Sequence, residues 1–225
     1  MGKNKLRKFA ENETFENMVQ APRTYLLENG LELKGEWHKE FFKNDNPIVL
    51  ELGCGKGEYT VGLGEQFPEK NFIGIDIKGA RMWRGARTAT DNKMTNIGFL
   101  RTHIELIHNC FAKGEVSEIW ITFPDPQIKY RRRKKRLTAP DMLDMYRKVL
   151  SDDAVIHLKT DSQFLLGYTL GIVEGYGHKV LDSSYDIDKQ KSENKLLQIR
   201  TNYEGIFRDK GMTITYIKFQ LNKNV

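Results

Sequence analysis

Apolar runs of strand length alternate with segments of helical periodicity over most of this chain, and this alternation constrains the fold more than any other feature. Strands separated by helical patterns of about 10–15 residues are typical of a parallel sheet with helices on both faces. We expect strands at residues 47–52, 72–77, 97–100, 119–123, 154–159 and 212–221. We expect helices at residues 58–67, 79–92 and 103–111, and from Pro140 to about residue 150.

The length of 225 residues fits one domain with a sizeable core. Residues 1–20 are polar, basic at the start and without sustained periodicity, so they are predicted to form a flexible basic N-terminal tail. Phe9, Phe15 and Met18 are candidate anchors within that tail. Neither a repeat nor a low-complexity linker follows, and residues 21–225 are therefore predicted to be a single domain.

Cysteine usage and hydropathy indicate the compartment. The two cysteines, Cys54 and Cys110, show no metal-like spacing, which predicts a reducing environment without a disulfide framework or a metal site. No apolar run approaches the roughly 20 residues that span a bilayer, and the N-terminus lacks the apolar core of a signal peptide. We therefore expect a cytoplasmic protein with no membrane partner.

The segment after the first predicted strand is rich in glycine. Gly53, Gly55 and Gly57 lack a Cβ, so the backbone there can turn sharply and approach a ligand closely. Asp76 ends the next predicted strand, where a carboxylate can bind both hydroxyls of a ribose. This pattern is shared by dinucleotide sites, S-adenosylmethionine sites and simple tight turns. Glu51 favours S-adenosylmethionine, because a carboxylate attracts an ammonium or sulfonium group and repels a pyrophosphate.

A Pro-Asp-Pro corner follows the predicted strand at residues 119–123. Pro124 and Pro126 fix φ and remove two backbone donors, so the corner is expected to be stiff and to present the carboxylate of Asp125. An unbroken basic run comes next, formed by Arg131, Arg132, Arg133, Lys134, Lys135 and Arg136. Its formal charge equals the net charge of the whole chain, +6. Such a local concentration suits the phosphate backbone of a nucleic acid, and a solvated loop is the alternative.

Four predicted strand ends carry a carboxylate. They belong to Glu51, Asp76, Asp125 and Asp161. In an open α/β sheet, ligands bind at the carboxyl ends of the strands. These four side chains are therefore expected to converge on one site.

The order of these segments resembles that of a known family. The stretches LELGCGKGEY, GID, TFPDPQIKYRRRKKRL, KTD and RTNYE are similar to successive signatures of bacterial tRNA (guanine-N7-)-methyltransferases, from about residue 47 to the C-terminus. The resemblance implies an α/β fold with a Rossmann-like seven-stranded methyltransferase sheet, mostly parallel with one antiparallel strand. It implies S-adenosyl-L-methionine as donor, S-adenosyl-L-homocysteine as product and tRNA as partner. The implied acceptor is N7 of a variable-loop guanine, position 46 in standard tRNA numbering.

The resemblance also implies roles for matching residues. Those expected on the donor side are Glu51, Gly53, Gly55, Asp76, His103 and Asp125. Those expected on the acceptor side are Lys129, Asp161, Thr201, Asn202, Tyr203 and Glu204. Asp125 and Asp161 are the expected catalytic residues, and the basic run at residues 131–136 is expected to contact RNA.

The chain departs from the family pattern in two places. Gln127 and Ile128 stand where Trp-Pro is usual, so a stacking role of that tryptophan is not carried over. His103 stands where an aspartate is usual, and either contacts adenine through backbone groups or only begins a helix. Thr201 and Glu204 also fit a helix capping box, Thr-x-x-Glu.

The chemistry of guanine N7 fits a chain without an evident catalytic base. N7 carries an in-plane lone pair and loses no proton on methylation, so positioning and charge placement are the expected contributions. We hypothesise that Asp161 or Asp125 accepts from guanine N1–H and the exocyclic amine. The alternatives are methylation of another RNA or DNA nitrogen, a nicotinamide-dependent oxidoreductase and a non-catalytic RNA-binding module. Both a monomer and a homodimer are compatible with the sequence.

Overall fold

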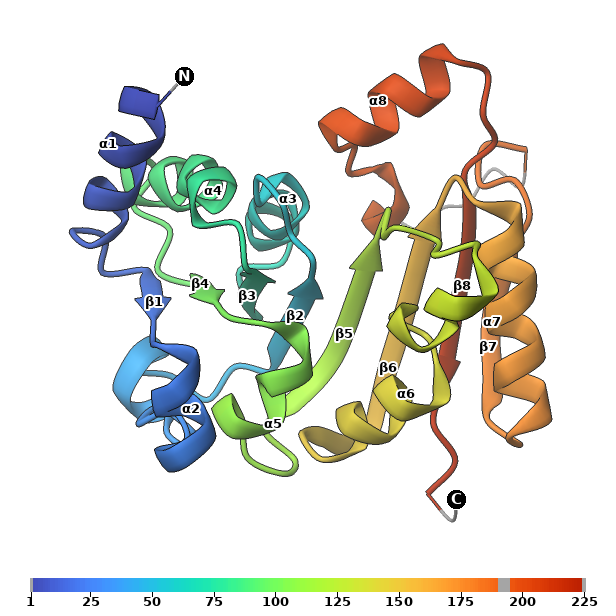
Figure 1. The fold of residues 1–225 in the computed structure, drawn as a ribbon, viewed down its shortest axis with the longest axis horizontal. Helices are drawn as coiled ribbons and strands as arrows, with labels where there is room; N and C mark the ends of the chain where they lie inside the picture. The colour runs from blue at the N-terminus through green and yellow to red at the C-terminus, as the bar shows by residue number, and fades with distance from the viewer. Residues whose placement is uncertain (1, 190–194, 224–225) are drawn as a thin grey trace.

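An eight-stranded sheet with the order β1-β4-β3-β2-β5-β6-β8-β7 forms the centre of the computed structural model, which describes residues 2–189 and 195–223 (Figure 1). The strands are β1 Met18–Gln20, β2 Ile48–Leu52, β3 Asn71–Asp76, β4 Ile97–Arg101, β5 Val116–Thr122, β6 Leu150–Thr160, β7 Lys179–Ser184 and β8 Thr215–Gln220.

Strands β1 to β6 pair in parallel, and β8 pairs antiparallel with both β6 and β7. The predicted fold class, a mostly parallel Rossmann-like sheet with one antiparallel strand, is confirmed. The sheet has one strand more than the seven expected. The additional strand is β1, in which Met18 lies opposite Phe99 of β4.

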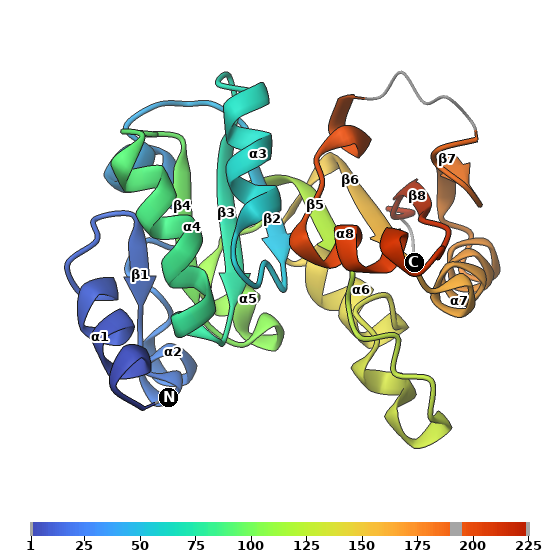
Figure 2. The ribbon, with the colours of Figure 1, turned by 90° about the horizontal axis from the view of Figure 1, so that it is seen from above.

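Helices cover both faces of the sheet, as Figures 1 and 2 show. They are α1 Gly2–Asn12, α2 Arg23–Asn29, α3 Glu58–Gln66, α4 Gly79–Asp91, α5 Ile107–Cys110, α6 Pro140–Arg147, α7 Gln163–Gly175 and α8 Asn202–Asp209. A π-helical turn at Trp37–Phe42 and 3₁₀ turns at Ile104–Leu106, Tyr130–Lys135 and Lys195–Gln198 complete the elements. Buried side chains of α2, α5, α6 and α7 form one core cluster, and those of α3 and α4 form a second.

The first twenty residues contain regular structure. Helix α1 lies beside α4 (Figure 1), where the Trp83 indole donates to Glu11 at 2.7 Å and the Asn12 amide donates to the Gly79 carbonyl at 2.9 Å. Met18 is buried, and the Phe9 ring contacts the Arg101 guanidinium at 4.8 Å. The structure thus adds a helix and a strand to the segment assigned to a tail. Its flexibility stays a prediction.

The predicted and observed elements agree closely in the first half of the sheet, where β3, α4 and β4 end within one residue of their predicted bounds. The predicted helix at residues 103–111 is shorter, a 3₁₀ turn followed by α5. Helix α6 stops at Arg147 because β6 already begins at Leu150. Among the described helices, none has both the length and the apolar character needed to cross a membrane.

Candidate active site

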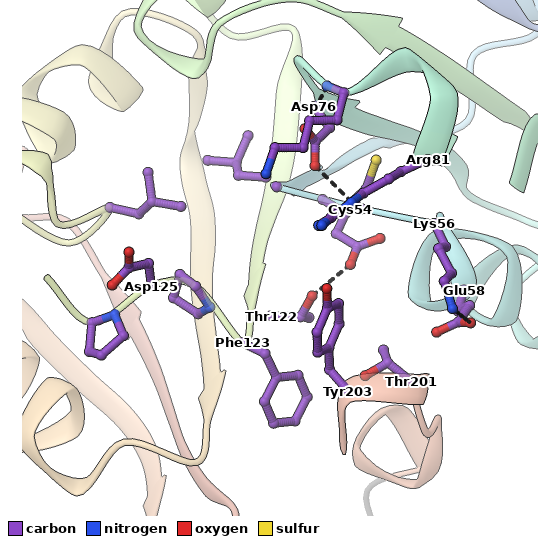
Figure 3. A pocket seen from close by; sticks show the side chains of 18 of the residues that line it. Cys54, Lys56, Glu58, Asp76, Arg81, Thr122, Phe123, Asp125, Thr201 and Tyr203 are labelled. Atoms are coloured by element: carbon purple, nitrogen blue, oxygen red, sulfur yellow. Dashed lines mark hydrogen bonds and ion pairs between the residues drawn. The ribbon is translucent and has the colours of Figure 1, made fainter. Parts of the chain in front are cut away.

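A cavity of about 520 Å³ lies at the carboxyl ends of β2, β3, β5 and β6 (Figure 3). Its lining includes all four carboxylates that the sequence analysis expected to converge, Glu51, Asp76, Asp125 and Asp161. Their parent strands are four consecutive strands of the sheet, in the order β3-β2-β5-β6. The parallel register therefore collects residues that are far apart in sequence.

Glu51 is almost completely buried, with 3% of its surface exposed. One carboxylate oxygen accepts from the Thr60 backbone N–H at 2.9 Å and from the Thr60 hydroxyl, and the other accepts from the Thr122 hydroxyl at 2.6 Å. Burial raises the pKa of Glu51 to about 7, although these hydrogen bonds oppose the rise. A cation bound nearby would stabilise the ionised form of this buried carboxyl group and so lower its pKa.

The glycine segment forms an open corner beside Asp76. Gly53 has φ +78°, and a Cβ added to it would meet no atom within 4 Å, so the corner is open on the cavity side. Gly57 has φ +72°, and a Cβ there would lie 2.5 Å from the Phe99 ring, so close packing requires glycine. The Asp76 carboxylate accepts from the backbone N–H groups of Gly55 at 3.0 Å and Lys78 at 2.8 Å. Asp76 thereby links the end of β3 to the glycine segment that follows β2, at the mouth of the cavity.

The Pro-Asp-Pro corner contains two residues in the left-handed region. Phe123 and Gln127 both have φ +47°, which is uncommon for residues other than glycine and is often found at functional sites. The backbone N–H of Phe123 donates to the Lys159 carbonyl on β6 at 2.8 Å. The exposed carboxylate of Asp125 accepts from the Gln127 N–H at 3.0 Å, which closes the turn. These two hydrogen bonds tie the corner to β6 and close its turn, and its predicted stiffness stays a prediction.

The opposite wall of the cavity comes from α8. Thr201, Tyr203 and Phe207 line it (Figure 3 labels the first two), and the Phe207 ring lies 5.8 Å from that of Phe123. The Thr201 hydroxyl accepts from the Glu204 N–H at 3.1 Å, so the threonine of the predicted capping box does cap the helix. Asp161 is half-buried across the cavity, and burial raises its pKa.

Four of the residues predicted for the donor and acceptor sides lie outside the lining of this cavity. His103 lines a separate hollow of about 370 Å³ together with Gln20 and Arg101. Lys129 and Asn202 are exposed and do not line the cavity, although the Asn202 N–H donates to the cavity-lining Glu58 at 2.6 Å. Glu204, a residue of α8, is completely buried and forms ion pairs with Lys159 and Arg208. Their predicted ligand contacts stay predictions.

The basic run forms a 3₁₀ turn and a short extension between β5 and α6, and Figure 2 shows this yellow-green segment extending away from the sheet. The first five cations are exposed, and Lys135 also lines the cavity. Arg136 differs from them, since only 6% of it is exposed. Its guanidinium donates to the Gln127 carbonyl at 3.1 Å and lies over the rings of Phe164 and Tyr168. Arg136 therefore anchors the loop, whereas it was expected on the RNA-contacting surface.

Sequence reasoning missed several residues that shape the site. Thr60 and Thr122 hold Glu51, and no motif distinguishes them from other threonines. Phe207 lines the cavity one helical turn after Tyr203, a spacing that the sequence does contain. Lys159 belongs to the quoted KTD stretch, but its buried position depends on contacts with residues about 40 positions later. No group of side chains suited to a metal ion occurs in the part of the chain that the structure describes.

Comparison with known proteins decides the family. A family model described as "Putative methyltransferase" matches residues 45–217. A tRNA (guanine-N(7)-)-methyltransferase of Christiangramia forsetii is 58% identical over 97% of this chain and 98% of its own length. The chain belongs to the tRNA (guanine-N7-)-methyltransferase family. The enzyme of the same name from Bacteroides fragilis is 52% identical over 98% of this chain and 87% of its own length.

Solved structures support the fold of this tRNA (guanine-N7-)-methyltransferase family member. The 16S rRNA methyltransferase KamB superposes with a TM-score of 0.64 at 14% identity, covering 85% of this chain and 95% of its own. A 16S rRNA (adenine(1408)-N(1))-methyltransferase from Catenulisporales acidiphilia, solved with its cosubstrate SAM, gives a TM-score of 0.55 at 16% identity, covering 85% and 92%. At these identities the likeness concerns the methyltransferase fold. The donor of the family is S-adenosyl-L-methionine.

Proposed function

We propose that this protein transfers the methyl group of S-adenosyl-L-methionine to N7 of a guanine in tRNA, forming N7-methylguanosine. The observation that carries the proposal is the 58% identity over nearly the full length to an enzyme of that name. The cavity supports it, because carboxylates of the glycine corner and of the Pro-Asp-Pro corner face a single space. The variable-loop guanine is the proposed acceptor.

The residues of the glycine corner fit the donor. The open side of Gly53 leaves room for a ligand, and Asp76 is placed to accept from ribose hydroxyls. The buried Glu51 supplies negative charge for a cationic ligand. When bound, S-adenosylmethionine supplies an electrophilic methyl group on a positively charged sulfur.

Asp125 and Asp161 serve the acceptor side in this proposal. Methylation forms the N7–carbon bond and breaks the sulfur–carbon bond, whose electron pair stays on sulfur. Positive charge therefore passes to the purine, and nearby carboxylates stabilise it. No proton leaves N7, so these carboxylates bind and orient the base. Tyr203 and Phe207 offer flat apolar surface to the same base.

The exposed part of the basic run, residues 131–135, is proposed to bind tRNA phosphates. The tRNA acceptor favours a cytoplasmic location. Both a monomer and a homodimer are consistent with a cavity formed by one chain.

The test is incubation of the purified protein with labelled donor and an unmodified tRNA transcript, followed by mass spectrometry of the nucleosides. We expect N7-methylguanosine, mapped to the variable loop by borohydride and aniline cleavage. A transcript with 7-deazaguanosine at the acceptor position should not be methylated, because it lacks N7. Label recovered on an exocyclic amine would contradict the proposal and favour another nitrogen acceptor.

A further inference from the structure

A fully buried lysine lies directly behind the α8 wall of the cavity. Lys159 is on β6, two residues before Asp161, and none of its side chain is exposed. It does not line the cavity. Its ammonium donates to the Leu197 carbonyl at 2.9 Å, the Ile199 carbonyl at 3.0 Å and the Glu204 carboxylate at 2.7 Å.

These three acceptors use all three hydrogens of the ammonium group. Two of them belong to the 3₁₀ turn and extended segment before α8, which pairs with none of the described strands, and the third belongs to α8 itself. Glu204 also accepts two hydrogen bonds from Arg208, at 2.9 and 2.8 Å, so its buried charge is shared between two cations. Lys159 thus holds the approach to the helix from the central sheet. The Tyr59 hydroxyl, which donates to the Leu196 carbonyl at 2.6 Å, and the Glu58 carboxylate, which accepts from the Asn202 N–H at 2.6 Å, hold it from α3.

The same strand carries two other parts of the site. The Lys159 carbonyl accepts from the Phe123 N–H, which holds the Pro-Asp-Pro corner, and Asp161 follows two residues later. A buried lysine has a large desolvation cost, and an apolar side chain of similar size would usually suffice for packing alone. The cost is explained if the ammonium aligns α8 with the two aspartates.

We infer that Lys159 is a positioning residue for the methyl transfer, holding Thr201, Tyr203 and Phe207 in place against Asp161 and Asp125. The inference rests on the proposed guanine methylation. It assigns Glu204 to the same anchor, as the buried partner of Lys159. The lysine acts through the α8 wall, so its loss should affect the orientation of the base more than the binding of donor or tRNA phosphates.

Replacement of Lys159 by methionine tests this inference. K159M removes the three hydrogen bonds and keeps an unbranched side chain of similar length. We expect kcat to fall by about 10- to 100-fold, because small displacements of reacting groups have effects of this size. The KM for tRNA and the dissociation constant of S-adenosylhomocysteine should change less than threefold. A purely structural role would lower the amount of active protein and leave kcat per active site unchanged.

The matched control is K70M. After Lys159, Lys70 is the least exposed lysine in an ion pair among the described residues. Its side chain is 30% exposed and pairs with Glu118 at 2.8 Å, and neither residue lines the cavity. K70M should lower the melting temperature and leave kcat within twofold. E204Q is the second variant. It keeps the shape of the anchor and should lower kcat at least fivefold, which decides the question if K159M does not fold.

Two results would overturn the inference. One is a wild-type kcat in K159M or in E204Q. The other is an equal loss of kcat, tRNA binding and S-adenosylhomocysteine binding in E204Q, which would indicate general misfolding. Absence of N7-methylguanosine with the wild-type protein would contradict the proposed function instead, so the two failures are distinguishable.

Discussion

Glu51 is buried at the edge of a cavity that is proposed to hold a cation. The stability of the donor-free protein should therefore depend on the protonation of Glu51. Its pKa is raised to about 7 in the folded state, first of all by burial, against an ordinary value of 4.5. Between these values the folded protein holds a proton that the unfolded chain has released. Stability must then fall as pH rises through this interval, by up to about 3 kcal/mol.

E51Q cannot ionise at this position and should lack that dependence. We expect the unfolding free energy of the wild type, measured with urea, to decrease relative to that of E51Q as the pH rises from 5 to 8. Other titrating groups cancel in this difference. Parallel pH profiles would show that Glu51 titrates normally. Donor affinity of the wild type should rise over the same pH range, because the ionised carboxylate attracts the cationic ligand.

Tyr130 is the first residue of the projecting 3₁₀ turn, Tyr130–Lys135. At 76%, it is the most exposed of the large apolar side chains in the described residues, and the Arg133 guanidinium lies 4.3 Å from its ring centroid. An exposed aromatic ring beside cations is suited to stacking on an unpaired base. We expect Y130A to weaken tRNA binding about fivefold or more, since such stacking contributes about 1–3 kcal/mol per base.

The salt dependence separates stacking from electrostatics. Y130A removes no charge, so the slope of log affinity against log salt concentration should stay unchanged in a filter-binding assay. Y130F should bind as wild type. Y185A, which alters another exposed tyrosine (62%), is the control. Normal affinity of Y130A would show that Tyr130 does not contact the RNA.

The elements themselves were predictable to the extent that local periodicity determines them. The strands β2 to β6 are apolar runs between helical patterns, and the sequence analysis located each of them. Strand β1 has only three residues, and its pairing with β4 depends on Phe99, about 80 positions later. Helix α1 is polar and needs contacts with α4. Both were missed because a distant partner, and no local pattern, determines them.

The same limit applies to single side chains within motifs. Six adjacent cations look alike in the sequence, and only the rings of Phe164 and Tyr168 on α7 distinguish Arg136. Lys159 looks like any lysine at a strand end until its contacts with Leu197 and Glu204 are known. The carboxylates were predictable because the ends of parallel strands always share one edge.

The charge of the molecule is unevenly distributed along the chain. The net charge of +6 equals the formal charge of residues 131–136, so the remainder of the chain is balanced overall. Because Arg136 is buried, five cations of the run remain to meet a polyanion. They lie next to the cavity, as the lining by Lys135 shows, so attraction of tRNA by these cations brings it directly to the proposed reaction site.

Salt dependence of tRNA binding should therefore come mainly from this loop. Each phosphate contact contributes about 0.7–0.9 log units of affinity per decade of salt. Replacement of both Arg131 and Arg132 by glutamine should reduce the slope by about 1.4–1.8 if each contacts one phosphate. K39Q removes an exposed cation from the π-helical turn that leads into the amino end of β2, whereas the basic run follows the carboxyl end of β5. K39Q should leave the slope unchanged. The Arg136 guanidinium binds the Gln127 carbonyl, so R136Q should loosen the loop and lower the affinity for tRNA. R136Q should change the slope by less than replacement of either exposed arginine does. Equal slopes for the wild type and the double variant would place the phosphate contacts elsewhere on the molecule.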